Sequence, residues 1–123
     1  MSEHNKVEAL NSLNARYEVL YEQMKLVEQQ ILELKVFGEE LDTIEENKNE
    51  EIMVPLGKSV FASAKLDVSK KFLVDIGAGH FIKKDISETK SVIVEQEQRL
   101  QSFKVQLSSE IDNIANELQK LII

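Results

Sequence analysis

Apolar residues in the first third of the chain recur at alternating steps of three and four. They are Leu10, Leu13, Tyr17, Leu20, Met24, Val27, Ile31 and Leu34. Such a heptad seam is typical of a helix that packs against another helix in a left-handed coiled coil. The pattern predicts one long amphipathic helix over residues 7–44, ended by the polar run 45–51. Beyond Leu34 the apolar stripe continues through Phe37, beside Gly38, which predicts a local three-residue shift of the heptad register.

The last third of the chain carries a second stripe. It consists of Val92, Ile93, Gln96, Leu100, Phe103, Leu107, Ile111, Ile114, Leu118 and Leu121. Two consecutive steps of four follow Phe103 and predict a stutter in this heptad. Ser87 is the expected N-cap of a helix that runs to Ile122. Two helices of similar length at opposite ends of one chain favour an antiparallel coiled-coil hairpin.

The segment between the helices changes its period from about 3.5 to 2. Apolar residues alternate with others over residues 52–56, 60–66, 72–76 and 80–86, and short turn sequences separate these runs. Alternation of this kind predicts four short strands, which form two consecutive β-hairpins. The expected fold is therefore α+β, with two β-hairpins between two long helices.

One domain is expected over residues 1–123, divided into an N-terminal helix (1–50), a hairpin segment (51–86) and a C-terminal helix (87–123). Four strands with an apolar face and open edges find no cover within this chain. We therefore expect an oligomer in which the strands build a β-barrel body and the coiled coils form arms. The expected interface residues are Val54, Leu56, Val60, Ala62, Ala64, Phe72, Val74, Ile76 and Ile82.

Composition removes several classes of protein. The 123 residues include no Cys, which excludes disulfide scaffolds and thiolate chemistry. No apolar run approaches the ~20 residues of a membrane-spanning helix, so no membrane partner is expected. A net charge of -7 argues against nucleic acid as the main partner. The start of the chain lacks the basic-then-apolar pattern of a signal peptide, and a cytoplasmic location is expected.

Candidate catalytic motifs are weak. The run Gly57-Lys58-Ser59 resembles the end of a phosphate-binding loop, but Ile52 stands where that loop requires glycine. His80, Asp75 and Ser63 lack the constrained turn and oxyanion hole that a hydrolase needs. No metal-binding spacing is present, so we expect a protein that is not an enzyme and uses no cofactor or metal.

The hairpin segment resembles the alpha class of prefoldin subunits. The resemblance lies in Ile52-Met53-Val54-Pro55-Leu56-Gly57, in Val60 to Lys65, and in Phe72-Leu73-Val74-Asp75-Ile76-Gly77-Ala78-Gly79. The family pattern differs at His80, where an aromatic residue such as Tyr is common. The resemblance implies a hexamer of two alpha-class and four beta-class subunits, or of six distinct subunits, with a double β-barrel and six coiled-coil arms. It also implies an ATP-independent chaperone that holds unfolded polypeptides and delivers them to a group II chaperonin.

The free end of the helical hairpin is the expected client-binding site. The residues that meet there are Val7, Leu10, Leu13, Leu118, Leu121, Ile122 and Ile123. Persistent exposed apolar surface generally marks an interaction site. The alternative is that these residues only close the coiled coil. For the whole protein, the alternative to a chaperone is a structural scaffold that tethers folded partners or builds filaments.

Overall fold

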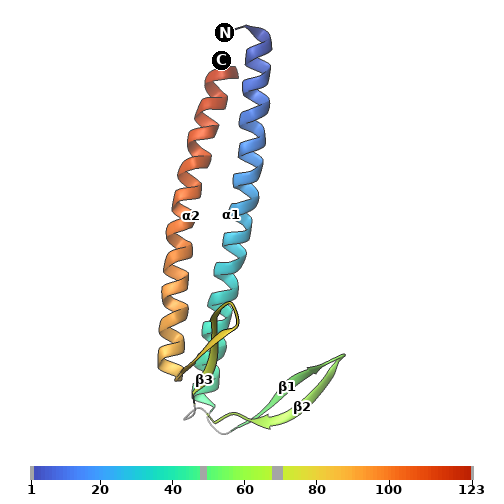
Figure 1. Cartoon of the computed structure of the whole chain (residues 1–123), viewed down its shortest axis with the longest axis vertical. Coiled ribbons are helices and arrows are strands. Elements are labelled where there is room, and N and C mark those ends of the chain that lie inside the picture. Colours follow the sequence, from blue (N-terminus) through green and yellow to red (C-terminus); the bar gives the residue numbers. More distant parts are fainter. Residues whose placement is uncertain (1, 48–49, 68–70, 123) are drawn as a thin grey trace. The chain divides into compact units, whose positions relative to one another are not determined.

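The computed structural model describes residues 2–47, 50–67 and 71–122, and its elements follow the predicted order. They are helix α1 (Glu3–Glu46), strands β1 (Glu51–Gly57), β2 (Val60–Lys65), β3 (Phe72–Gly77) and β4 (His80–Lys84), and helix α2 (Ile86–Ile122). The helices run antiparallel and the two hairpins lie between them in sequence, so the predicted α+β fold is confirmed (Figure 1). Both helices extend beyond the predicted ends, since α1 begins at Glu3 and α2 at Ile86.

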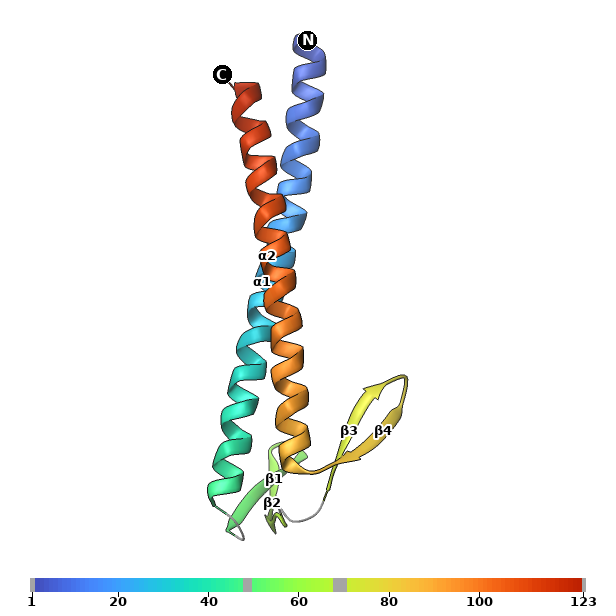
Figure 2. The ribbon, with the colours of Figure 1, turned by 90° about the vertical axis from the view of Figure 1, so that its left-hand side faces the viewer.

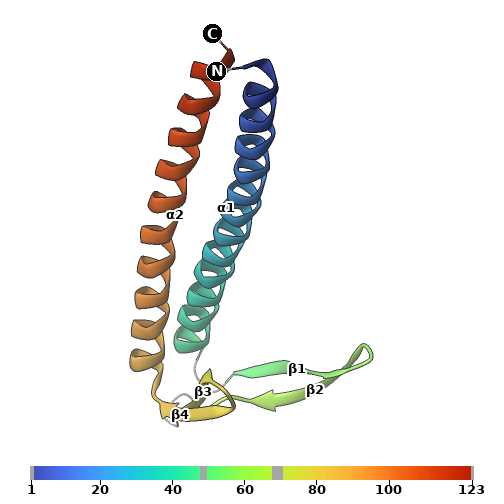
Figure 3. The same ribbon diagram turned by 45° about the horizontal axis from the view of Figure 1, so that its top comes forward.

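The structure divides into two units, one holding residues up to 33 and from 97 onward, the other residues 34–96. In the first unit the antiparallel helices bring both ends of the chain to the same end (Figure 3). Its buried residues are Leu13, Val27, Ile31, Leu107 and Ile114, and Leu20, Met24 and Leu100 pack against the cluster of Val27, Ile31 and Leu107. All are seam residues of the predicted heptads, so this unit is an antiparallel coiled coil.

The heptad of α1 passes through Gly38 without a break. Phe37 is 44% exposed, whereas Gly38 is half-buried and Leu41 is buried. A Cβ atom on Gly38 would lie 3.9 Å from Cγ2 of Ile93 on α2. The predicted register shift at Phe37 is therefore wrong. Which position faces the partner helix is decided by the coil geometry and not by the size of the side chain.

The heptad of α2 is also continuous. Phe103 is 44% exposed, whereas Lys104 is half-buried between the seam residues Leu100 and Leu107. The Lys104 ammonium lies 3.7 Å from Oε1 of Glu28 on α1, so the apolar stem of the lysine follows the seam while its charge reaches a carboxylate. The predicted stutter after Phe103 is therefore wrong.

Helix α2 begins with a capping box that involves Asp85. The backbone N–H of Glu88 donates to Oδ1 of Asp85 (2.8 Å), and the backbone N–H of Asp85 donates to Oε1 of Glu88 (3.3 Å). Ser87 already lies inside the helix, so its predicted role as N-cap is wrong. Asp85 takes this role because it precedes the first helical residue and its carboxylate reaches the amide of Glu88 three residues later.

The strands form two separate two-stranded antiparallel sheets, β1–β2 and β3–β4 (Figures 1 and 2). Cross-strand partners run from Glu51 and Lys65 to Pro55 and Phe61 in the first hairpin. The turn residues Lys58 and Ser59 have φ angles of 49° and 63°, as a type I′ hairpin turn requires. Both predicted hairpins are confirmed, and within the described residues neither sheet gains a third strand from this chain.

Candidate interaction surfaces

The end of the arm that holds both chain termini exposes two of the predicted client-binding residues. Val7 is 54% exposed and Ile122 is 75% exposed. Leu10, Leu118 and Leu121 are half-buried, Leu13 is buried in the seam, and Ile123 lies outside the described residues. The tip is therefore partly a closed coiled coil, with apolar surface at its two outer residues.

A shallow groove lies further along the same unit. It has a volume of about 330 Å³ and is lined by Ala15, Arg16, Val19, Leu20 and Glu110. Val19 is 58% exposed, so its apolar side chain is open to solvent. The flanking Arg16 and Glu110 bring one charge of each sign. This groove was not predicted from the sequence, because Val19 stands outside the heptad seam.

An aromatic pair lies next to this groove in sequence. The rings of Tyr17 and Tyr21 are stacked, with centroids 6.1 Å apart and an interplanar angle of 7°. The Lys25 ammonium stands 4.8 Å from the centre of the Tyr21 ring and 3.5 Å from Oε1 of Glu22. Tyr21 is 47% exposed. Its four-residue spacing from Tyr17 and Lys25 is the signal that predicts these contacts on a helix.

The strand residues expected at the oligomer interface share one face of each hairpin, because side chains alternate between the faces of a strand. Leu56, Val60, Ile76 and Ile82 are 42–67% exposed, Val54 is 36% exposed, and Ala62, Ala64, Phe72 and Val74 are half-buried. This apolar surface is called the Val54 face in the first hairpin and the Val74 face in the second.

The opposite faces of the hairpins are apolar as well. Met53 and Phe61 of the first hairpin are 63% and 57% exposed, and Leu73 and Phe81 of the second are 67% and 60% exposed. Only one apolar face was predicted for each strand from the sequence. The missed signal is that large apolar residues occupy both odd and even positions of every strand.

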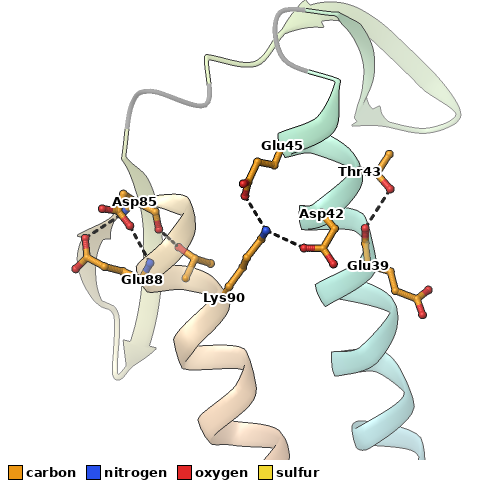
Figure 4. A network of polar contacts seen from close by, with 8 residues as sticks. Glu39, Asp42, Thr43, Glu45, Asp85, Glu88 and Lys90 are labelled. Carbon is orange, nitrogen blue, oxygen red and sulfur yellow. Dashed lines mark hydrogen bonds and ion pairs between the residues drawn. The ribbon is translucent and has the colours of Figure 1, made fainter.

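Lys90, in the first turns of α2, forms ion pairs with two carboxylates near the end of α1 in the second unit. Its ammonium lies 2.7 Å from Oδ1 of Asp42 and donates to Oε2 of Glu45 at 2.6 Å (Figure 4). Hydrogen bonds to Asp42 and Glu45 raise the pKa of Lys90. The network fixes the ends of the helices that lead into the strands.

The carboxyl group of Asp85 is held in its charged form. Its pKa is lowered chiefly because it accepts the backbone hydrogen bond from Glu88, against an opposing effect of desolvation, and the positive charge of Lys71 lowers it further. The hydroxyl of Thr89 donates to the carbonyl of Asp85 at 2.8 Å. The contacts of Asp85 with Glu88 and Thr89 stabilise the first turn of α2, so the carboxylates of Asp85 and Glu88 have a structural role.

The described residues hold no group of three or more His, Cys, Asp or Glu side chains that could bind a metal ion. Within the same ranges, no helix combines the length and the apolar character needed to cross a membrane. His80 begins strand β4 and is exposed, while the Asp75 carboxylate accepts the backbone N–H of Gly77 at 2.8 Å. Asp75 therefore stabilises the turn of the second hairpin by accepting this hydrogen bond.

Comparison with known proteins identifies the class. The family model of the prefoldin subunit matches residues 8–122. The chain is 24% identical to prefoldin subunit alpha of Archaeoglobus fulgidus over 115 residues, which cover 87% of this chain and 84% of the relative. It is 27% identical to prefoldin subunit alpha of Methanococcus vannielii over 123 residues, covering 94% and 83%. The chain belongs to the prefoldin family, and these relatives place it in the alpha class.

The fold agrees with this assignment. A chain in the cryo-EM structure of filamentous PFD from Methanocaldococcus jannaschii matches with a TM-score of 0.82 at 20% identity, over 94% of this chain and 96% of that chain. Prefoldin subunits are non-enzymatic chaperone subunits, so the predictions of family and of a non-enzyme are confirmed. Membership of the alpha class implies a chaperone role in a complex with beta subunits.

Proposed function

We propose that the protein is a subunit of an ATP-independent holdase, which binds unfolded polypeptides through the tips of its coiled-coil arms. The observation that supports this most directly is the apolar surface of the arm. Val7 and Ile122 are each more than half exposed at the end of the unit that carries both chain ends. A coiled coil needs neither residue for its own seam, since both lie outside the heptad positions.

The chemistry of this surface suits non-native chains. Covering a large aliphatic side chain stabilises a complex by about 1.5–3 kcal/mol at most, and the contact requires no particular sequence in the client. One such contact is weak. Several arms that hold the same client raise the effective concentration of each further contact, so the complex binds more tightly than one arm. Release then needs only a competing surface and no nucleotide, which fits delivery to a group II chaperonin.

The Val54 and Val74 faces are proposed to form the β-barrel body with beta-class subunits, as two alpha-class and four beta-class chains or as a hexamer of distinct subunits. Two-stranded sheets are marginal on their own, and both hairpins leave apolar side chains exposed in the single chain. Burial of these faces between subunits removes that surface from water. The arms then extend from a common body.

Suppression of client aggregation by the assembled complex tests the holdase proposal. The double variant Val7→Ser with Ile122→Ser is expected to lower the suppression several-fold, because it removes exposed tip side chains and leaves the seam intact. Val105→Ser is the matched control, since Val105 is 69% exposed on the same helix as Ile122 but far from the tip. Equal loss in both variants, or none in the tip variant, would contradict binding at the tips.

A structural role is the second candidate. The M. jannaschii structure of the same fold is described as filamentous, and on that ground a scaffold is the alternative role that we propose. Electron microscopy of the chain alone distinguishes the two functions when it is combined with the aggregation assay. Filaments without suppression of aggregation would favour the scaffold, and discrete assemblies with suppression would favour the holdase.

A further inference from the structure

Helix α1 carries a second row of apolar side chains that lies outside its heptad seam. Val19 and Leu26 are 58% and 60% exposed, and their spacing of seven residues places both on one face of the helix. Val19 lines the groove between α1 and α2, together with Arg16 and Glu110. Leu26 therefore extends the apolar surface beside this groove by one heptad.

Helix α2 extends the same surface from the other side. Phe103 precedes Glu110 by seven residues, so it lies on the face of α2 that borders the groove, and it is 44% exposed. Because the helices are antiparallel, Phe103 lies from Glu110 in the direction in which Leu26 lies from Val19 (Figure 1). These residues all belong to the unit that carries both chain ends. The apolar surface formed by Val19, Leu26 and Phe103 is called the Val19 strip.

The spacing of the Val19 strip matches the side of another helix. Apolar side chains on an amphipathic helix recur at the same heptad spacing and can pack between Val19, Leu26 and Phe103. Side chains of an extended chain alternate every two residues and do not keep this spacing. The surface runs along α1 from Arg16 to Glu33, or roughly 27 Å at 1.5 Å per residue, which is enough for five turns of a bound helix.

The charges around the strip favour a basic partner. Glu33 occupies the next position of the row formed by Val19 and Leu26, and Glu110 borders the groove from α2. Arg16 lies at the opposite end of the strip from Glu33. The unit of residues up to 33 and from 97 onward has ten acidic and six basic side chains in its sequence. Lys or Arg side chains on a partner are therefore attracted to this side of the arm.

We infer that the Val19 strip binds an amphipathic helix of a partner protein, with Lys or Arg beside its apolar stripe. The charges also set the direction of the bound helix. Its C-terminal end, which carries the negative end of the helix dipole, lies near Arg16, and its N-terminal end lies near Glu33. The bound helix therefore runs parallel to α2. This inference goes beyond the proposed function, because the arm tip is proposed to take unfolded chains and the Val19 strip takes a helix.

Fluorescence anisotropy with a labelled peptide tests the inference on the full chain and on its complex with beta-class subunits. The probe is a helix-forming peptide of about 18 residues, with Leu at heptad spacing, Lys beside the Leu stripe and Ala elsewhere. Val19→Ser with Leu26→Ser is expected to weaken binding at least tenfold. Val105→Ser is the matched control and is expected to leave binding unchanged, since Val105 is 69% exposed on α2 but lies about 200° round the helix from Phe103.

Charge is tested on both partners. Glu33→Gln and Glu110→Gln are each expected to weaken binding about threefold at low ionic strength. Glu18→Gln is the matched control, because Glu18 lies about 100° round α1 from Val19. A peptide with Glu in place of Lys is expected to bind at least tenfold more weakly, and so is a peptide of the same composition with its heptad pattern scrambled. Equal binding of the scrambled or the acidic peptide would overturn the inference.

The tip and the strip are separated by exchanging the two assays. Val7→Ser with Ile122→Ser is expected to keep peptide binding, and Val19→Ser with Leu26→Ser is expected to keep suppression of aggregation. A wild-type chain that suppresses aggregation without binding the peptide refutes the strip alone and leaves the proposed function standing. Sedimentation velocity gives the remaining outcome. If Val19→Ser with Leu26→Ser lowers the mass of the chain in the absence of peptide, the strip joins copies of this chain and the inference is wrong.

Discussion

Replacement of Gly38 by alanine is expected to stabilise the arm. Gly38 occupies a seam position inside the 44-residue helix α1, about two turns before its C-terminal end, where it is half-buried. Its φ angle is helical rather than left-handed, and the nearest atom to an added Cβ would be Ile93 Cγ2 at 3.9 Å, an ordinary van der Waals contact. Nothing at this position requires a glycine, and an alanine fits without displacement of its neighbours.

The magnitude follows from two contributions. Glycine in a helix interior is about 0.8–1.0 kcal/mol less favourable than alanine, because it loses more backbone entropy on folding. Partial burial of the new methyl group against Ile93 adds about half of the ~0.8 kcal/mol expected for a fully buried methylene. Gly38→Ala should therefore raise the free energy of unfolding by about 1–1.5 kcal/mol, or the melting temperature by roughly 4–6 °C.

Thermal and urea unfolding followed by circular dichroism measure this change. Gly57→Ala is the matched control: no atom lies within 4 Å of its added Cβ, yet its φ angle of 112° disfavours any L side chain. The control is expected to lose stability although it also removes a glycine. If Gly38→Ala has no effect or destabilises the chain, the heptad does not pass through Gly38 as described, and the reasoning fails.

Three further predictions concern charge and turn chemistry. Because the pKa of Lys90 is raised in the folded chain, its contribution to stability is complete at neutral pH, which lies below the ordinary lysine pKa. This contribution is lost as the pH rises through the raised pKa of the folded state. Lys90→Met should therefore flatten the alkaline part of the pH–stability curve. Because the pKa of Asp85 is lowered in the folded chain, Asp85 contributes stability above the ordinary aspartate pKa and loses it as the pH falls through the lowered pKa of the folded state. Asp85→Asn should abolish this acid dependence and still cap the helix. Thermal unfolding measured over a range of pH values tests this. Lys58→Asn with Ser59→Gly should stabilise the first hairpin by roughly 1 kcal/mol, measured by hydrogen exchange in β1 and β2, because both positions have positive φ. If the exchange rates in β1 and β2 are the same in the variant and the wild type, Lys58 and Ser59 are not strained in this turn.

Both phenylalanines beside the seams show where inference from apolar pattern failed. Phe37 and Phe103 were assigned to the stripe because each is a large apolar residue next to a position without one, yet each is 44% exposed. Gly38 and Lys104 take the inward positions. Hydrophobicity alone ranks residues by their preference for burial, whereas the partner helix determines which position is covered.

The candidate site was also only partly accessible to sequence reasoning. Val7 and Ile122 were identified as tip residues and are exposed, whereas Leu13 of the same predicted set is buried. The groove beside Val19 and the exposed apolar side chains on the second face of each hairpin, such as Met53 and Leu73, were missed. Both depend on residues outside the expected seam or strand face, whose exposure is known only when neighbouring elements are in place.

The amino-acid sequence by itself determined the type and order of the elements, because heptad spacing, alternation and turn residues act over a few positions. The prefoldin resemblance also came from local motifs in the hairpins. The tertiary structure decided the continuous heptads, the capping role of Asp85 and the cross-strand register of the hairpins. The heptads and the cross-strand register depend on contacts between residues that are remote in sequence. The capping role of Asp85 depends on the exact residue at which α2 begins. The order of side chains along the chain specifies neither the contacts nor that residue.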